Sequence, residues 1–209
     1  MQVVNTDPTP EAPPPRKRFK PGERRLQILQ TLAGMLEQPG AERVTTAALA
    51  ARLELSEAAL YRHFASKAQM FEGLIDFIET SLFTLVNQIV DSPQAVAPPG
   101  QAARIASVIL QFGEKNPGMT RVMVGDALVL EHERLQARMN QFFDRIESSL
   151  RQVLRTVAEA QGLPAPTAQA QVLASVWVSF IIGRLQRYAR SGFKRLPTEQ
   201  LDAALKTIG

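Results

Sequence analysis

The spacing of apolar residues is the feature that most restricts the fold of this chain. Over residues 74–89 they recur every three or four positions, as in Leu74, Ile78 and Leu82, and residues 135–157 show the same pattern. A period near 3.6 residues is typical of an amphipathic helix, whereas a half-buried strand alternates with a period of two. No segment alternates in that way, and no internal repeat is found. The pattern therefore predicts an all-α fold with eight or nine helices.

Capping residues and helix breakers set the expected helix boundaries. Thr45, Ser56 and Thr167 each precede a periodic apolar segment and carry a side-chain oxygen that suits a helix N-cap. Ser66, followed three positions later by Gln69, predicts a capping box at the start of a long helix. The expected helices cover residues 23–38, 46–53, 57–64, 66–90, a segment around 105–112, then 122–130, 132–161, 168–191 and a last helix that starts at Pro197, with loops at 92–100 and 162–166.

The sequence divides into three parts. Residues 1–22 hold six of the 14 prolines and the basic run at residues 16–20, so we expect a disordered tail that either solubilises the protein or contacts phosphates. Residues 23–67 contain closely spaced short helices, which we interpret as a helix-turn-helix DNA-binding domain. Residues 68–209 carry the long helices, and we expect them to form a helical dimerisation and partner-binding domain.

Positive charge is concentrated in one quarter of the chain. Residues 16–67 contain ten Lys and Arg against five Asp and Glu, a net charge of +5. Residues 1–15 carry −2, and residues 68–209 carry only +1. A local basic block is what a polyanion-binding surface needs, because each neutralised phosphate releases condensed counterions. Duplex DNA and an anionic membrane surface both fit this charge.

Several classes of function are disfavoured by what the sequence lacks. It has no cysteine, which removes disulfides, thiolate metal sites and cysteine nucleophiles, and its two histidines, His63 and His132, are far apart. It has no Gly-rich phosphate loop and no nucleophile elbow, so we expect no enzyme, no metal site and no cofactor. The longest apolar stretch, residues 172–183, is too short to span a bilayer, and the N-terminus lacks a signal-peptide pattern. We expect a soluble cytoplasmic protein.

Two of the expected helices, 46–53 and 57–64, are separated by only Glu54 and Leu55. This is the arrangement of a helix-turn-helix, in which the second helix enters the major groove of DNA. Such a helix needs apolar residues on its inner side to fix its angle. It also needs small or polar residues at its front, where the base edges lie.

Side chains of suitable chemistry occupy these front positions. Ser56 and Ala58 are short enough to allow close approach to base edges and thymine methyl groups. The hydroxyl, imidazole and ammonium groups that follow are suited to phosphate contacts, although His63 also fits a partly buried structural role. The candidate DNA contacts are Thr45, Thr46, Ser56, Ala58, Tyr61, His63 and Lys67.

Residues 23–70 resemble the DNA-binding domain of TetR-type regulators. The resemblance rests on the paired threonines before AALAARL and on LSEAALYRHFASKAQM, which is close to the family signature Ser-x-x-x-Leu-Tyr-x-His-Phe-x-x-Lys. The family typically has glycine in the turn before the recognition helix, where this chain has Glu54. A residue other than glycine costs on the order of 1 kcal/mol there if φ is positive.

Three longer stretches resemble one branch of that family, the nucleoid occlusion factors. They are SEAALYRHFASKAQMFEGLIDFIETSL, FGEKNPGMTRVMVGDALVLEHERLQARMNQFFDRIESSLRQVLR and GRLQRYARSGFKRLPTE. The resemblance implies a nucleoid-associated homodimer that binds chromosomal palindromes and, while bound, prevents assembly of the tubulin-like division GTPase FtsZ. It also implies that the surface for FtsZ includes Phe77, Lys115, Asn116 and Met119.

These partner residues also have a structural interpretation. Phe77 lies at helical spacing with core residues, and a phenylalanine in such a position is more often buried than exposed. Lys115 and Asn116 fit a turn ahead of Pro117. Both interpretations stay open from the sequence.

Two alternative functions remain open as well. One is a ligand-responsive transcriptional repressor, with its effector bound among the helices of residues 100–195. Trp177 would then line the effector pocket, although its position in a helix that is apolar on nearly all sides favours the core or a dimer seam. The other is binding of the basic block to a membrane surface, although we expect no membrane partner.

Overall fold

The computed structural model describes residues 22–38, 43–92 and 99–208, and within these ranges the chain is helical and contains no strand. The predicted all-α fold is confirmed. The described elements are α1 (Glu23–Leu36), α2 (Thr46–Arg52), α3 (Glu57–Tyr61), α4 (Lys67–Val90), α5 (Pro99–Lys115), α6 (Pro117–Met123), the 3₁₀ helix η1 (Asp126–Leu128), α7 (Glu133–Ala160), α8 (Pro166–Arg190) and α9 (Leu201–Ile208).

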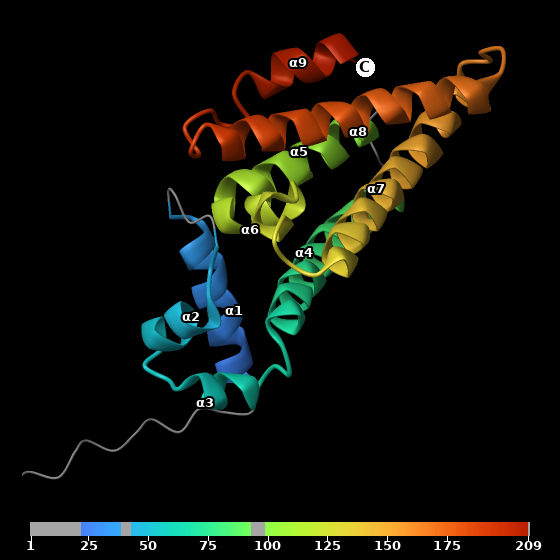
Figure 1. Cartoon of the computed structure of the whole chain (residues 1–209). Helices are drawn as coiled ribbons and strands as arrows, with labels where there is room; N and C mark the ends of the chain where they lie inside the picture. The colour runs from blue at the N-terminus through green and yellow to red at the C-terminus, as the bar shows by residue number, and fades with distance from the viewer. Residues whose placement is uncertain (1–21, 39–42, 93–98, 209) are drawn as a thin grey trace, which may run out of the picture.

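The helices α1 to α3 form a small head, and the helices from α4 onward form a larger body (Figure 1). In the head, α1 packs on α2 and α2 packs on α3, around apolar side chains such as Leu32, Leu49, Leu60 and Phe64, which are at most 1% exposed. The head meets the body at two places: α4 leaves the head and runs into the body, and α1 packs against α6. The orientation of the head therefore depends on α4 and on the α1–α6 contact.

The body is built around α7 and α8, which are joined by the turn at residues 161–165 and pack against each other. The helix α5 contacts α4, α7 and α8 and so occupies the centre of the body. Phe83 of α4 and Phe142 of α7 meet edge to face, with ring centroids 5.4 Å apart. Trp177 of α8 is 1% exposed, which confirms its expected place in the core.

The long helices lie where the apolar period predicts them. α4 begins one residue later than the expected range 66–90, and α7 is one residue shorter at each end than the expected range 132–161. The predicted cap of α4 is present, because the Ser66 hydroxyl accepts the backbone N–H of Gln69 at 3.2 Å. The Gln69 side chain in turn accepts the N–H of Ala65, one residue before the cap, at 2.8 Å.

The predicted end of the recognition helix was wrong. α3 stops at Tyr61 rather than at residue 64. Phe64 is buried in the head and α4 begins at Lys67. Residues 62–66 therefore form the turn between the two helices and do not continue α3.

Three prolines begin helices at positions that differ from the expected boundaries. Pro99, Pro117 and Pro166 each begin a helix, because proline lacks a backbone N–H and suits the first helical position. Thr167 is therefore inside α8 and does not cap it, and residues 117–128 form α6 and η1 instead of one helix over 122–130. Pro197 does not begin the last helix, since α9 starts at Leu201.

By length and composition alone, α4 and α8 are apolar enough to cross a membrane, with mean hydropathy of 1.2 and 1.3 over their most apolar windows. The longest uninterrupted apolar stretch did not indicate this. The composition is weak evidence for a membrane span, because the core helix of a soluble protein meets the same criterion. Both helices contribute buried side chains to the core, Leu74 and Ile78 from α4 and Trp177 and Ile181 from α8 among them.

Candidate nucleic-acid interface

Two capped helices begin next to each other in the head. The Thr45 hydroxyl accepts the backbone N–H of Ala48 at the start of α2, at 3.1 Å. The Ser56 hydroxyl accepts the N–H of Ala59 at the start of α3, at 3.2 Å. Both predicted caps are confirmed, and each satisfies a backbone donor that the first helical turn leaves unpaired.

A direct hydrogen bond joins the first residues of these two helices. The Thr46 hydroxyl donates to Glu57 Oε2 at 2.6 Å. This contact brings Thr45, Thr46 and Ser56 to one side of the head, where Thr45 and Ser56 are exposed and Thr46 is half-buried. Three of the candidate DNA contacts therefore share one surface.

The turn between α2 and α3 has the conformation that favours glycine. Glu54 adopts φ of 55°, in the left-handed region. A positive φ was considered for this position because TetR-type regulators typically have glycine there. The turn is held by the N–H of Leu55, which donates to the Ala50 carbonyl at 2.9 Å. A side chain at such a position costs on the order of 1 kcal/mol relative to glycine. The chain tolerates that strain and keeps the helix-turn-helix geometry.

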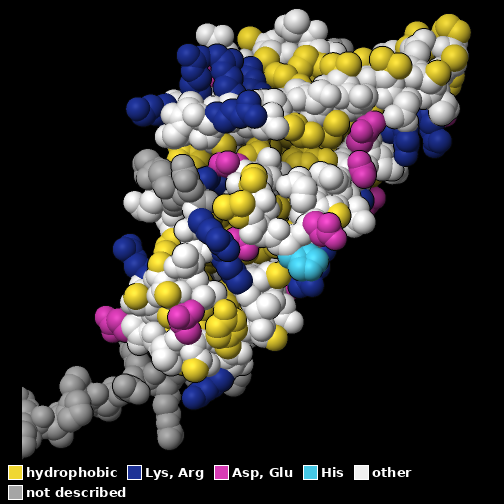
Figure 2. Space-filling view, viewed as in Figure 1, with side chains coloured by type: hydrophobic (Ala, Val, Ile, Leu, Met, Phe, Trp, Pro, Cys, Tyr) yellow, Lys and Arg dark blue, Asp and Glu magenta, His cyan; other side chains and the backbone are white. Residues whose placement is uncertain are grey.

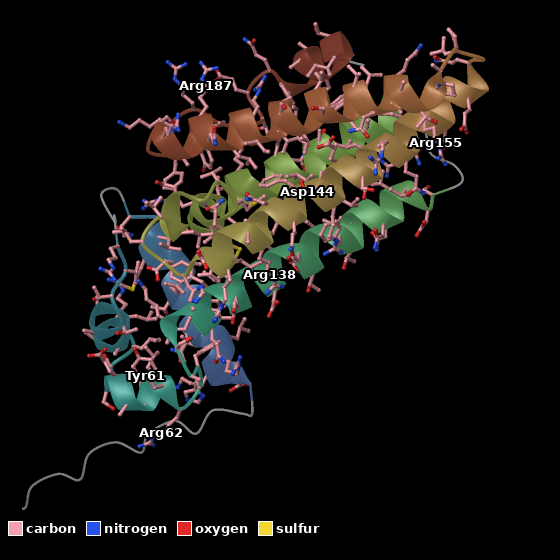
Figure 3. All side chains as sticks on the ribbon, turned by 45° about the vertical axis from the view of Figure 1, so that its right-hand side comes forward. Tyr61, Arg62, Arg138, Asp144, Arg155 and Arg187 are labelled. Atoms are coloured by element: carbon pink, nitrogen blue, oxygen red, sulfur yellow. The ribbon has the colours of Figure 1, made fainter. Side chains whose placement is uncertain are left out.

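The recognition helix α3 has a buried side and an exposed side. Leu60 is fully buried, whereas Ser56 and Ala58 are exposed and Tyr61 is 43% exposed. Figure 3 shows Tyr61 and Arg62 at the end of the molecule that is farthest from α8. This division into a buried anchor and a small, polar outer side is what a helix in the major groove requires.

Arg25 of α1 supports the residues that follow α3. Its guanidinium donates to the His63 carbonyl at 2.5 Å and lies 4.2 Å from the centre of the Phe64 ring. The His63 side chain is half-buried, an exposure that suits a structural role and also leaves part of the ring accessible to a phosphate. The sequence analysis missed Arg25, since nothing in the local pattern connects it to residues 38 positions away.

Lys67 is not a free cation. Its ammonium group pairs with the carboxylate of Glu131, which precedes α7, and the two side chains are only 19% and 9% exposed. The same ammonium lies 5.7 Å from the centre of the Phe71 ring. The phosphate contact of Lys67 stays a prediction. Any such contact involves an ammonium group that already pairs with Glu131 in the free protein.

The Lys67–Glu131 pair is the first of a row of ion pairs that join α4 to α7 and to the residues just before it. Arg134 pairs with Glu72 at 2.8 Å. Further along, Arg138 pairs with Asp76 at 2.5 Å and with Glu79 at 2.8 Å. The hydrogen bond to Glu79, and then that to Asp76, raises the pKa of Arg138 above its ordinary value. Figure 3 shows Arg138 on α7 where this helix runs beside α4.

The candidate partner residues differ in what they present to solvent. Phe77 is 45% exposed, so the interpretation of it as a core residue was wrong, and Leu85 on the same helix is 42% exposed. Lys115 is exposed at the end of α5. Asn116 precedes α6, and its side-chain amide donates to the Phe112 carbonyl at 2.8 Å, which confirms its expected role in the turn. Met119 packs against the core and is partly buried.

A second cationic cluster lies at the C-terminal end of α8. Figure 2 shows Lys and Arg side chains gathered over that end of the helix. Arg187 and Arg190 lie in the last turn of α8, and Lys194 and Arg195 follow within five residues of its end. The charge count did not reveal it, because acidic residues elsewhere in residues 68–209 bring the net charge of that region close to zero.

The described residues form no metal site, and their hollows differ in size. One of about 320 Å³ lies beside Asp126 and Arg190, and one of about 430 Å³ lies on α8 at Val172 and Leu173. None of the described His, Asp and Glu side chains form a group of three or more that suits a metal ion. A cavity of about 140 Å³ lies beside Trp177 and Leu154, between the ends of α7 and α8. Ligand pockets usually have roughly 300–1,000 Å³. The indole N–H of Trp177 is buried without a hydrogen-bond partner.

Two family descriptions match this sequence and together cover most of it. Residues 28–74 match the bacterial regulatory proteins of the tetR family. Residues 101–208 match the tetracyclin repressor-like C-terminal domain of the SlmA-like type. The first range contains the helix-turn-helix, and the second contains α6 to α9 and nearly all of α5.

Curated relatives are similar over nearly their whole length. The nucleoid occlusion factor SlmA of Idiomarina loihiensis is 51% identical over 180 residues, which are 86% of this chain and 90% of the relative. SlmA of Photobacterium profundum is 50% identical over 88% of this chain and 92% of the relative. SlmA of Vibrio cholerae is 48% identical over 86% and 90%.

Solved structures of TetR-type regulators share the fold at low identity. MbdR from Azoarcus sp. CIB superposes with a TM-score of 0.72 at 15% identity, covering 88% of this chain and 95% of that one. PfmR from Thermus thermophilus superposes with a TM-score of 0.69 at 21% identity, covering 87% and 96%. At this identity the likeness concerns the fold alone.

Proposed function

This chain belongs to the TetR family of bacterial regulatory proteins, in its group of nucleoid occlusion factors, and we propose that it binds palindromic chromosomal DNA as a homodimer and, while bound, prevents FtsZ ring assembly. It is a DNA-binding regulator and not a member of an enzyme family. Its place in the cell is the nucleoid within the cytoplasm. The observation that carries the proposal is an identity of about 50% with curated nucleoid occlusion factors over 86–88% of the chain, a range that includes residues of both head and body.

The geometry of the head supports the DNA-binding part. The front of α3 exposes Ser56, Ala58 and Tyr61, and Thr45 lies beside them at the start of α2. Small side chains at the front admit base edges, and hydroxyl groups around them suit phosphate oxygens. In this proposal the base-reading positions are Ser56 and Ala58, while the other candidate residues contact the DNA backbone.

The outer face of α8 supports the homodimer. Val172, Leu173 and Val176 are 65%, 39% and 48% exposed, although they lie on one of the most apolar helices of the chain. Figure 2 shows apolar side chains along the N-terminal half of that helix. A second copy of the chain would cover this stripe, and a two-fold axis would place the two heads on successive half-sites of a palindrome.

Exposed residues on α4 and α5 support the contact with FtsZ. Phe77 and Leu85 are eight positions apart on α4, which places them two turns apart along the helix and about 80° apart around its axis, on adjacent parts of one side. Lys115 adds a cation at the end of α5, which packs on α4. An exposed aromatic and an exposed aliphatic residue on one helix, with a cation on the helix that packs on it, are suited to a short peptide that carries apolar and acidic side chains.

The alternative of a ligand-responsive repressor receives less support. A hollow of about 430 Å³ lies on the exposed α8 residues assigned to the homodimer, and one of about 320 Å³ is lined in part by the charged residues Asp126 and Arg190. The cavity beside Trp177 has about 140 Å³, less than half of the lower limit for usual ligand pockets. It also lies between the far ends of α7 and α8, away from the part of α4 that leads to the head. A chromatin map separates the two functions, because occlusion requires many dispersed sites whereas a repressor occupies a few promoters.

A sedimentation assay tests the proposal directly. The purified protein is first used to select a duplex from a random pool, and FtsZ polymer is then sedimented with the protein and either the selected or a scrambled duplex. We expect the selected duplex to lower the amount of sedimented FtsZ and the scrambled duplex to leave it nearly unchanged. A protein that selects no duplex, or that acts on FtsZ equally with both, contradicts the proposal.

A further inference from the structure

The ion pair between Lys67 and Glu131 joins the residue that begins α4 to the loop that precedes α7. Lys67 is the first residue of its helix, where the positive end of the helix dipole disfavours a cation. A cation in this place is stabilised when an anion lies against it. In the free protein that anion is Glu131.

The polarity of this pair is opposite to that of the neighbouring pairs. Glu72 and Asp76 place the acid on α4 and the base on α7, where Arg134 and Arg138 pair with them. Among the described pairs, only the one next to the head has its base on α4 and its acid on the other segment. Clamping α4 to α7 does not require this reversal. The reversal places the cation of Lys67 at the start of α4, the helix that follows the recognition helix α3 and emerges from the head.

Resting on the proposed DNA-binding function, we propose that Glu131 is an internal competitor of DNA phosphate for the Lys67 ammonium and thereby sets the affinity of the protein for DNA. A carboxylate and a phosphate oxygen offer the same kind of acceptor to a lysine. With its side chain 19% exposed, the Lys67 ammonium is largely enclosed by its contacts within the protein. A phosphate contact at Lys67 therefore requires the ammonium group to turn away from Glu131.

Turning away has a cost that falls on Glu131. Its side chain is 9% exposed, and a carboxylate without a partner in such a place loses both hydration and its counter-charge. The segment that carries it is held by the N–H of Glu131, which donates to the Leu128 carbonyl at 3.0 Å. The pair thus weakens DNA binding by the free energy needed to separate it, and the protein binds less tightly than its contact surface permits.

The substitution Glu131→Gln tests this competition. The amide keeps the size of the side chain and an oxygen that accepts from Lys67, so the fold is retained, but the charge that holds the ammonium is lost. We expect the affinity for the selected duplex to rise roughly three- to tenfold. Where Glu131 still holds the ammonium in part of the bound population, its removal also steepens the slope of log K against log salt concentration, by at most about 0.9, the value for one full phosphate contact.

The matched control is Glu72→Gln, which removes the same charge from the neighbouring pair with Arg134. Both variants change the net charge equally, so a general electrostatic effect would tighten binding in both. We expect Glu72→Gln to leave the affinity within about twofold of the unchanged protein, since its pair does not involve Lys67.

The double variant with Lys67→Met identifies the group for which Glu131 competes. With the ammonium removed, Glu131→Gln should no longer change DNA affinity, because no competition remains. If Glu131→Gln unfolds at assay temperature, Glu131→Asp serves in its place, since its shorter side chain lengthens the contact while keeping the charge, and a smaller rise in affinity is expected.

Two results overturn the inference. One is weaker DNA binding by Glu131→Gln, which would mean that Glu131 holds Lys67 in its DNA-binding position. The other is an equal effect of Glu131→Gln and Glu72→Gln. Failure of the proposed function is distinguishable from both, because the unchanged protein would then show no preference for a selected over a scrambled duplex before any variant is made.

Discussion

The hydroxyl of Thr46 donates a hydrogen bond of 2.6 Å to Glu57 Oε2, and this bond connects the first residue of α2 to the first residue of α3. The angle between these two helices determines where the front of α3 lies relative to a bound duplex. A single side-chain contact therefore contributes both to the stability of the head and to the orientation in which α3 is proposed to meet DNA.

Removing the Thr46 hydroxyl should destabilise the head. Thr46→Val preserves shape but loses the hydroxyl, and we expect the free energy of unfolding to fall by about 0.5–1 kcal/mol. Glu57→Gln retains an acceptor for Thr46 and should be nearly neutral. Urea unfolding followed by circular dichroism measures both. Equal stability of Thr46→Val and the unchanged protein would mean that the contact contributes nothing.

Relieving the strained turn should have the opposite effect. Glu54 adopts a φ of 55°, so Glu54→Gly should raise stability by about 0.5–1 kcal/mol. For a chain of this size that corresponds to roughly 1–4 °C in Tm. Glu54→Ala keeps the β-carbon and should give no comparable gain. If glycine and alanine shift Tm equally, the strain at this position does not limit stability.

Local signals predicted the parts of this structure that depend on nearby residues. Thr45, Ser56 and Ser66 cap the helices that their sequence context indicates, because an N-cap acts only on the first turn of the helix that follows it. The pairing of Lys67 with Glu131 could not be predicted in this way. The two residues are 64 positions apart, and they meet only because α4 packs on α7.

The exposure of Phe77 has the same kind of cause. Its helical spacing from Leu74 and Ile78 favours burial, but the period alone does not define where the buried stripe of α4 ends. That boundary depends on which helices cover α4. Packing of the body leaves Phe77 45% exposed while Ile78, the next residue, is fully buried.

Base preference should respond to the front of α3. Ala58 is exposed, so Ala58→Leu leaves the core of the head intact but places a larger side chain against the base edges. We expect the preferred palindrome to change, by roughly 1–3 kcal/mol for each affected base pair. Selection from a random duplex pool with both proteins measures this. Recovery of the same sequence by both would place Ala58 outside the groove.

The proposed FtsZ surface should be separable from DNA binding. Phe77→Ser removes an exposed aromatic ring, and we expect it to abolish most of the inhibition of FtsZ assembly while leaving affinity for the selected duplex unchanged. Leu196→Ser is the matched control, since Leu196 has a similar exposure of 47% but lies after α8. An equal loss of inhibition in both variants would argue against a specific role of Phe77.

The contact between α1 and α6 should be sensitive to a single methyl group. At Gly118 on α6, a β-carbon would lie 2.0 Å from the Ala33 carbonyl oxygen of α1, closer than any real contact. Gly118→Ala must therefore push α1 and α6 apart, at a cost of about 1–3 kcal/mol or more. Gly34→Ala provides the control, because a β-carbon there meets no atom within 4 Å.

Gly118→Ala should lower the stability of the protein and Gly34→Ala should raise it, although Gly34 and the Ala33 carbonyl are adjacent on α1. Gly34→Ala should stabilise the helix by up to about 1 kcal/mol, because alanine favours a helix interior more than glycine does. Because α1 belongs to the head and α6 to the body, Gly118→Ala should also shift the head and weaken binding to the selected duplex. Thermal unfolding and duplex affinity, measured on both variants, test this together. A Gly118→Ala protein with unchanged Tm and unchanged affinity would show that the α1–α6 contact does not hold the head against the body.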